Sequence, residues 1–371
     1  GGYTSFSLSG SVSFNASPPF ITNVPSFVQS LGTNNAHTIV EIPPSNENVS
    51  SLLGWSRLYN QACVILIVTN PPASTNPTVT VILQTSFNGQ LPGDDVTKVI
   101  RVLNNASQTF LSTNNLLRLP FLSLTTTFTD LREAATDMFV TQIDVGAYAT
   151  WLATNVVAQT KFSGGAAPIL YVADQRNIGT NKLAVVRLTR ATKLPYNNGL
   201  GFTVATQNPL YVWGNYNTTI NSNIYAATVG STTNGAAVPA ALIADAITIL
   251  SPNWSDALSA SVFASRTASS MTVNAAMLCG NVPSTGVTST TFSGGVHNLT
   301  RFLENWAGAT LTYNTSLVCL FSSQMATNQW RAQHNSNPSG YYDPPTRLWG
   351  FDQNFSNPNK LPPGTPVYGL P

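Results

Sequence analysis

The chain has very little charge. Asp, Glu, Lys and Arg make up 8% of its 371 residues, where a soluble protein usually has about 25%. Hydrophobic residues account for an ordinary 43%, so Asn, Ser, Thr and Gln take the place of the missing charges. Disordered chains combine low hydrophobicity with high net charge, and this composition has neither. We expect a folded protein with an uncharged polar surface.

The low net charge also limits which binding partners the protein can have. A formal net charge of +2, with no cluster of Lys and Arg, excludes the electrostatic footprint of a nucleic-acid-binding protein. Weak charge also means weak repulsion between copies of the molecule. The composition therefore predicts that the chain associates with copies of itself and binds no nucleic acid.

Long hydrophobic runs are missing as well. Even the apolar run from Cys63 to Val68 is far too short to cross a bilayer, so we expect no membrane span. The first residues, Gly1-Gly-Tyr-Thr, show no signal-peptide pattern, which leaves open whether a leader or anchoring helix was removed. Abundant Ser, Thr and Asn with little Lys or Glu favours an exported protein, located outside the cell or on its surface.

Cysteine is scarce. Cys63, Cys279 and Cys319 are too few and too widely spaced for a disulfide framework, and no C-x-x-C metal motif is present. Each lies in an apolar run, where cysteine behaves as a small hydrophobic residue. Free buried thiols are the simplest expectation, and a Cys279–Cys319 bridge is the alternative.

Sequence motifs for catalysis, metal binding or cofactor binding are absent too. The three histidines, His37, His297 and His334, have no neighbouring ligand at a metal-binding spacing, and the chain has no phosphate-binding loop, dinucleotide fingerprint or nucleophile elbow. We therefore predict no catalytic residue, no metal and no cofactor.

Asp245 is the acidic residue that requires an explanation. It interrupts the apolar run from Leu242 to Leu250, and a charge buried in such a run needs a partner. We expect an ion pair with an arginine or hydrogen bonds to the backbone. The alternative is a catalytic acid, which would require a groove with two further ionisable side chains.

Short β-type runs dominate what is present. Between Phe202 and Cys319 they are bounded by Gly, Asn and Pro, as is typical of strands: 202–206, 210–214, 242–250, 272–278, 311–313 and 317–321. Because some of these runs are joined by only a few residues, we expect the chain to coil. The predicted fold is mainly β, with a parallel β-helix (solenoid)-like body.

Four segments are expected. Residues 1–51 form an N-terminal β segment that is part of the solenoid, with a strand near 37–42. Residues 52–160 form an inserted small α/β module, residues 161–334 form the β-solenoid body, and residues 335–371 form an extended tail. In the module, Asp144 is the expected N-cap of a helix, and apolar residues recur from Val145 to Val156 at helical spacing. A second, short helix is predicted at 298–306.

The tail is rich in proline and aromatic residues. Its prolines exclude a regular helix or a central strand, so we expect it to lie extended on its own body or, alternatively, on a neighbouring subunit. Its possible assembly contacts are Tyr341, Tyr342, Trp349, Phe351 and Phe355. Further aromatic residues could face a glycan instead: Trp213, Tyr216 and Trp254.

Several phrases in order along the chain resemble a family of uncharacterised bacterial pilus-assembly or prepilin-like exported surface proteins. They are Arg57-Leu-Tyr-Asn-Gln-Ala62, Phe128-Thr-Asp-Leu-Arg-Glu133, Leu170-Tyr-Val-Ala-Asp174, Asn208-Pro-Leu-Tyr-Val-Trp-Gly214, Ala244-Asp-Ala-Ile-Thr-Ile-Leu250 and Phe302-Leu-Glu-Asn-Trp306. The resemblance implies a β-helix-like body, export, and association with the envelope or with filaments. It carries over no catalytic residue.

Together these features predict an exported, non-enzymatic structural protein, a surface- or filament-associated subunit that acts through self-assembly or adhesion. The alternative is a glycan-acting β-solenoid enzyme or carbohydrate-binding adhesin. A viral coat protein would also suit the low charge, although not the expected α/β module.

Overall fold

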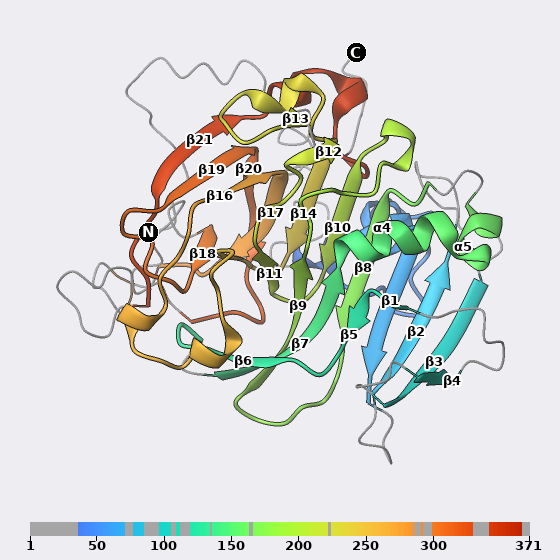
Figure 1. Ribbon diagram of the computed structural model, residues 1–371. Helices are drawn as coiled ribbons and strands as arrows, with labels where there is room; N and C mark the ends of the chain where they lie inside the picture. Colours follow the sequence, from blue (N-terminus) through green and yellow to red (C-terminus); the bar gives the residue numbers. More distant parts are fainter. Residues whose placement is uncertain are drawn as a thin grey trace.

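The computed structural model describes residues 36–70, 77–84, 96–104, 109–111, 119–133, 136–162, 166–221, 224–284, 286, 291, 299–328 and 341–365 (Figure 1). The β segment predicted before residue 36 lies outside these residues. Strands β3 and β4 are described by their backbone alone.

Two large sheets form the body. The larger has nine strands in the order β20-β17-β14-β10-β8-β1-β2-β3-β4. Their bounds are β1 Val64–Thr69, β2 Thr78–Leu83, β3 Val96–Asn104, β4 Thr109–Leu111, β8 Ile169–Asp174, β10 Phe202–Thr206, β14 Ala240–Ala244, β17 Ala276–Asn281 and β20 Leu317–Ser322. Strands β1 to β4 pair antiparallel, and the strands from β1 through β8 to β20 pair in parallel.

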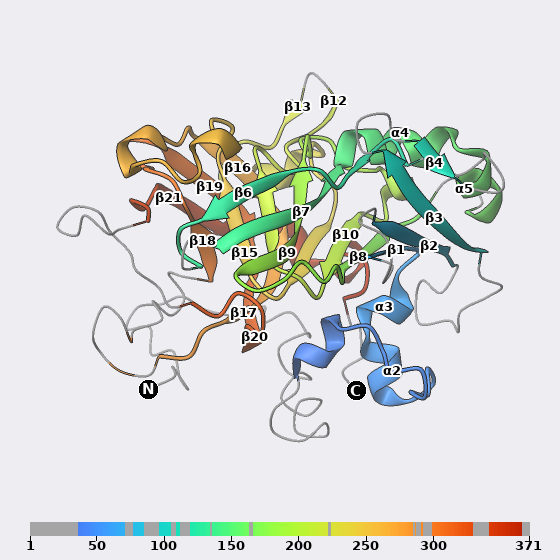
Figure 2. The ribbon, with the colours of Figure 1, turned by 90° about the horizontal axis from the view of Figure 1, so that it is seen from below.

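The second sheet has seven strands, six in the order β18-β15-β11-β9-β7-β5, with β6 also paired to β7. Their bounds are β5 Leu122–Ser123, β6 Thr127–Asp130, β7 Thr136–Asp144, β9 Lys182–Thr189, β11 Leu210–Trp213, β15 Ile247–Leu250 and β18 Thr300–Phe302. The chain passes back and forth between the two sheets, so that β8 is followed by β9 and β10 by β11 (Figures 1 and 2).

The main core lies between these sheets. Side chains of one face stand in register along the nine-stranded sheet: Val64, Leu170, Val204, Leu242, Met277 and Leu317. A matching row crosses the seven-stranded sheet: Ile143, Leu188, Val212, Ile249 and Phe302. Both rows belong to one apolar cluster, and the burial of such side chains provides most of the free energy of folding.

A third sheet completes the core. Strands β16 Met271–Asn274, β19 Thr310–Thr315 and β21 Thr346–Phe351 pair in parallel. Asn274 and Asn314 stand in register, and the Asn314 Nδ2 atom donates to the Asn274 Oδ1 atom at 2.7 Å. Asn274 in turn donates to the Asn217 carbonyl at 2.9 Å. This amide ladder satisfies buried polar groups that would otherwise destabilise the fold.

Helices cover the remaining apolar surface. Helix α4 (Val145–Thr154) begins at the predicted N-cap, where the Asp144 side chain accepts the Ala147 N–H at 2.9 Å, and α5 (Val156–Lys161) follows it. The helix prediction after Asp144 is confirmed. On the outer face of the nine-stranded sheet lie α2 (Leu52–Ser56), α3 (Leu58–Gln61) and the 3-10 helix η1 (Ala36–Val40) (Figure 2).

The predicted β-helix body with an inserted module is wrong. The fold is mixed α/β: its two large sheets combine parallel and antiparallel strands, and no sheet closes on itself in the described part of the chain. Strands β1 and β7 come from the expected module, yet they pair in parallel with β8 and β9. Short strands joined by tight corners occur in both architectures, so the sequence pattern did not separate them.

Two local predictions are also wrong. Residues 36–40 form η1 in place of the strand expected at 37–42, and 300–302 form β18 in place of a helix. At β18 the neighbouring parallel strand β15 supplies hydrogen bonds, so pairing outweighs the local apolar spacing that resembled a helix.

Candidate functional site

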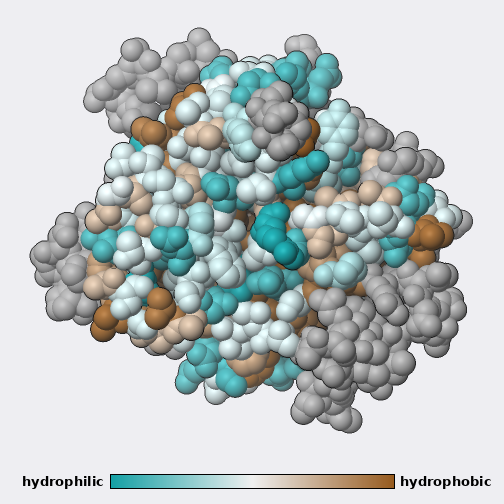
Figure 3. Space-filling model, in the orientation of Figure 1, coloured by the Kyte–Doolittle hydropathy of each residue, from teal (hydrophilic) through white to brown (hydrophobic). Residues whose placement is uncertain are grey.

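Many of the few charged residues in this chain are buried. Of its 16 basic and 14 acidic residues, at least six arginines, six aspartates and two glutamates are buried. Asp, Glu and Arg are almost never buried unless they are paired. The surface is therefore even poorer in charge than the composition indicates, and the face in Figure 3 is mostly pale, with small separate hydrophilic and hydrophobic patches.

Asp245 stands between β14 and β15 and is 0% exposed. Its carboxylate accepts three backbone N–H groups, from Gln324 at 2.5 Å, Met325 at 3.2 Å and Ala326 at 2.9 Å. Burial alone would raise the pKa of Asp245, but the contact with His37 and these N–H groups outweigh it and lower the pKa. The carboxylate is thus held ionised by the segment that follows β20.

His37 is the second partner of Asp245. Its Nε2 atom lies 3.2 Å from the Asp245 Oδ1 atom, as an ion pair that is not aligned for a hydrogen bond. Its Nδ1 atom lies 2.7 Å from Oε1 of Glu41. Burial lowers the pKa of His37, but the two carboxylates outweigh burial and raise it. The ring also packs edge-on against Phe321 of β20, with 4.9 Å between centroids.

A second buried network reaches the same segment. Arg301 of β18 donates to Oε1 of Glu133 at 2.9 Å, to the Ala326 carbonyl at 2.8 Å and to Oγ of Ser323 at 3.3 Å. The other Glu133 oxygen accepts the Asn328 N–H at 3.1 Å. Burial raises the pKa of Glu133, and the charge of Arg301 opposes that increase.

Asp245 and Arg301 therefore fix residues 323–328 from two sides. These residues leave β20 directly, so the networks determine where that strand ends and hold it on the sheet. Neither network offers a substrate any access, because Asp245, His37, Arg301 and Glu133 are at most 5% exposed. The geometry is that of an internal clamp.

The aromatic residues named as possible glycan contacts do not share a groove. Tyr216 is 0% exposed and belongs to the main core. Trp254 is 4% exposed and donates its indole N–H to Asp256 at 2.8 Å. Trp213 is half-buried beneath the Arg187 guanidinium, which lies 4.8 Å from its ring centre.

The aromatic residues of the tail lie against their own chain. Tyr342 and Phe355 are 3% and 5% exposed, whereas Tyr341, Trp349 and Phe351 are half-buried. Trp349 packs on Tyr313 of β19. The tail thus adds β21 to the third sheet and continues through the 3-10 turns η8 (Gln353–Ser356) and η9 (Pro358–Lys360).

Strand β20 forms one edge of the nine-stranded sheet. Its sequence, Leu-Val-Cys-Leu-Phe-Ser, has no charged residue and no proline. Leu317, Val318, Leu320 and Phe321 are half-buried, and Cys319 is exposed. Edge strands are normally protected by lysine, proline or a cover because their free N–H and C=O groups pair readily with another chain. A register shift after Cys319 is the one irregularity of its pairing with β17.

β21 is the matching edge of the third sheet, and its Leu348 is 48% exposed. β17 is the neighbour of β20 in the nine-stranded sheet, and β19 is the neighbour of β21 in the third sheet. Along the chain, β18 links β17 to β19. Neither β20 nor β21 pairs with a further strand in the part of the chain that the structure describes, and these two open edges lie at the same end of the body. The sequence predicted β20 as a strand, but its uncharged residues gave no signal that it is an edge.

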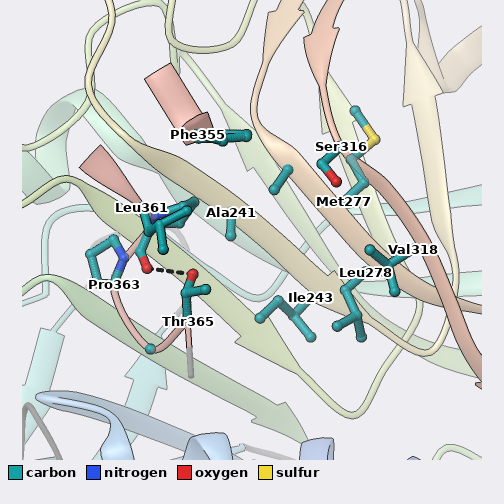
Figure 4. A pocket seen from close by; sticks show the side chains of 13 residues that line it. Ala241, Ile243, Met277, Leu278, Ser316, Val318, Phe355, Leu361, Pro363 and Thr365 are labelled. Carbon is teal, nitrogen blue, oxygen red and sulfur yellow. Dashed lines mark hydrogen bonds between the residues drawn. The ribbon is translucent and has the colours of Figure 1, made fainter. Parts of the chain in front are cut away.

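A small crevice lies beside β20, between the outer face of the sheet and the tail (Figure 4). Ile243, Leu278 and Val318 line it from the sheet, and Phe355 and Leu361 line it from the tail. Its volume of about 50 Å³ is well below the several hundred Å³ of a typical ligand pocket. Its lining is that of a packing gap.

No three His, Cys, Asp or Glu side chains among the described residues converge as metal ligands would. No helix in the described ranges is long and apolar enough to cross a bilayer. Comparison with protein-family models, with curated proteins and with solved structures found no match.

Proposed function

We propose that this protein is a structural subunit, exported to the cell surface or beyond it, that associates with copies of itself through the open edges β20 and β21. The observation that carries the proposal is β20 itself, an uncharged, partly exposed apolar edge strand. In this role the protein acts by packing, without turning over a substrate.

Two properties favour association through β20: its unpaired backbone groups and the low net charge of the molecule. A second copy that pairs with β20 satisfies its free backbone groups and buries Val318, Leu320 and Phe321. The low net charge of +2 leaves little repulsion to oppose the approach of an identical molecule. Leu348 on β21 extends the apolar contact to the neighbouring sheet edge.

The clamp on residues 323–328 serves the same role. An edge strand that frays cannot present a regular ladder to a partner, and association would then have to order the strand at an entropic cost. Asp245 and Arg301 hold the end of β20 in place before any partner arrives. The buried charged residues thus hold in place the uncharged edge strand through which copies associate.

Sedimentation velocity over a range of protein concentrations tests the proposal. Wild type should self-associate, and Leu320→Lys and Leu348→Lys should each weaken association at least tenfold, because a lysine on an edge opposes pairing. Val262→Lys is the matched control, since Val262 is 73% exposed and belongs to neither edge strand. A monomeric wild type at every concentration, or an equal effect of the control, would contradict the proposal.

A further inference from the structure

Cys279 and Cys319 stand directly opposite each other on adjacent strands. They are register partners in the parallel pair β17 and β20. In a sheet, register partners on neighbouring strands point to the same face and lie about 4.8 Å apart, within the Cα range that a disulfide spans. Both thiols are free.

The two cysteines belong to a row that faces the main core. On the other side of β17, the register partner of Cys279 is Ala244 of β14, which is buried in the same core. Cys279 is 0% exposed and packs in this core. Cys319 is exposed because β20 is the last strand and no further strand covers it among the described residues.

We propose that this pair is an oxidation site, at which a disulfide closes between Cys279 and Cys319 and locks β20 onto the sheet. The exposed thiol is the entry point for a small disulfide oxidant such as oxidised glutathione. The Cys319 thiolate attacks the oxidant and releases one glutathione thiol, which leaves a mixed disulfide on Cys319. The Cys279 thiolate then attacks the Cys319 sulfur and releases the second glutathione. Two protein thiols are oxidised, and one disulfide molecule is reduced to two thiols.

The two thiols differ in exposure, and this difference fits the order of the two steps, because Cys319 is exposed and Cys279 is buried. Burial raises the pKa of Cys279 beyond the usual range of a thiol, and Cys279 donates to the Leu299 carbonyl at 3.4 Å. Burial also raises the pKa of Cys319, so the reaction should accelerate at alkaline pH. Cys63 is buried as well, with its pKa raised by burial to about 12. It immediately precedes β1, which is four strands from β17.

The bridge would act on the strand that we assign to association, yet it does not depend on that role. It closes a loop of about 40 residues, from 279 to 319, and so restricts the unfolded chain. Closure of such a loop should raise the melting temperature by about 5 °C.

The test is oxidation of the purified full chain with oxidised glutathione at mildly alkaline pH, at a protein concentration low enough to keep it monomeric. Intact mass should fall by two hydrogens, and peptide mapping without reductant should join the peptides that contain Cys279 and Cys319. The melting temperature should rise, and dithiothreitol should reverse the rise.

Three variants make the result decisive. Cys319→Ser, at an exposed position, should abolish both the bridge and the stabilisation, and Cys279→Ala should stop the reaction at a glutathione adduct on Cys319. Cys63→Ala should leave both unchanged. The proposal is overturned if wild type accumulates only that adduct, if Cys319 pairs between molecules, or if the bridged chain melts no higher than the reduced one. None of these results depends on self-association, so failure here leaves the proposed function standing.

Discussion

Replacing Asp245 tests whether the buried carboxylate is a clamp. Asp245→Ala removes the acceptor of three backbone N–H groups at 324–326 and leaves His37 beside Glu41 alone. Breaking a buried ion pair costs about 3–5 kcal/mol, and an N–H that loses its acceptor in the interior costs about 1–3 kcal/mol. Because the segment can relax towards solvent, we expect a total loss of about 4 kcal/mol.

Asp245→Asn should cost about 3 kcal/mol. The amide keeps one oxygen for these N–H groups but lacks the charge that pairs with His37 and presents NH₂ where an acceptor is needed. Asp137→Asn is the matched control, because the same change at this exposed residue of β7 should cost less than about 0.5 kcal/mol. Such losses are large beside a total stability of about 5–15 kcal/mol.

The assay is urea unfolding followed by circular dichroism, with a double-mutant cycle that combines Asp245→Asn and His37→Gln. The cycle should give a coupling energy of at least about 1 kcal/mol. A loss below about 1 kcal/mol for Asp245→Asn, or additive single changes, would refute the clamp.

Three further predictions concern pH and backbone geometry. His37 has a raised pKa, so its contribution to stability is complete below about pH 6.5 and disappears as the pH rises through the pKa of the folded state. Urea unfolding from pH 6 to 9 should show this loss of stability in wild type and not in His37→Gln. Burial raises the pKa of Glu304 from 4.5 to about 7, which should lower stability by about 3 kcal/mol as the pH rises through that interval; Glu304→Gln should flatten the profile, and an unchanged profile would count against a buried, titrating Glu304. Gly201→Ala should destabilise by more than about 3 kcal/mol in thermal melts, because φ is +92° and the new Cβ atom would lie 2.1 Å from the Pro239 carbonyl oxygen; a melt within a few degrees of wild type would show that the turn can relax.

Local patterns predicted many elements of this fold. The strands around 202–206, 210–213 and 317–321 are present, and so is the helix that Asp144 caps. The single run expected at 242–250 is divided at Asp245 into β14 and β15, which belong to different sheets. These elements are set by the residues within them, through side-chain shape, spacing and capping. The overall architecture depends on which strands pair, and the pairing of β1 with β8 joins residues more than one hundred positions apart.

The buried networks could not be predicted from the sequence because they too join residues that are far apart in the chain. Asp245 is conspicuous in the sequence because a carboxylate interrupts an apolar run, but nothing in the sequence marks His37 as its partner. The two meet only because η1 folds back over the end of β20. Trp254 and Tyr216 were named for their chemistry, and their burial depends on neighbours supplied by other strands.

We propose that copies of this protein pair through β20. Hydrogen–deuterium exchange of the amides in 317–322, measured at low and high protein concentration, tests it most directly. If copies pair through β20, these amides become more protected as concentration rises, while the protection of those of the central strand β10 stays unchanged. Exchange in 317–322 that is the same at every concentration, in a protein that nevertheless sediments as an oligomer, would contradict it.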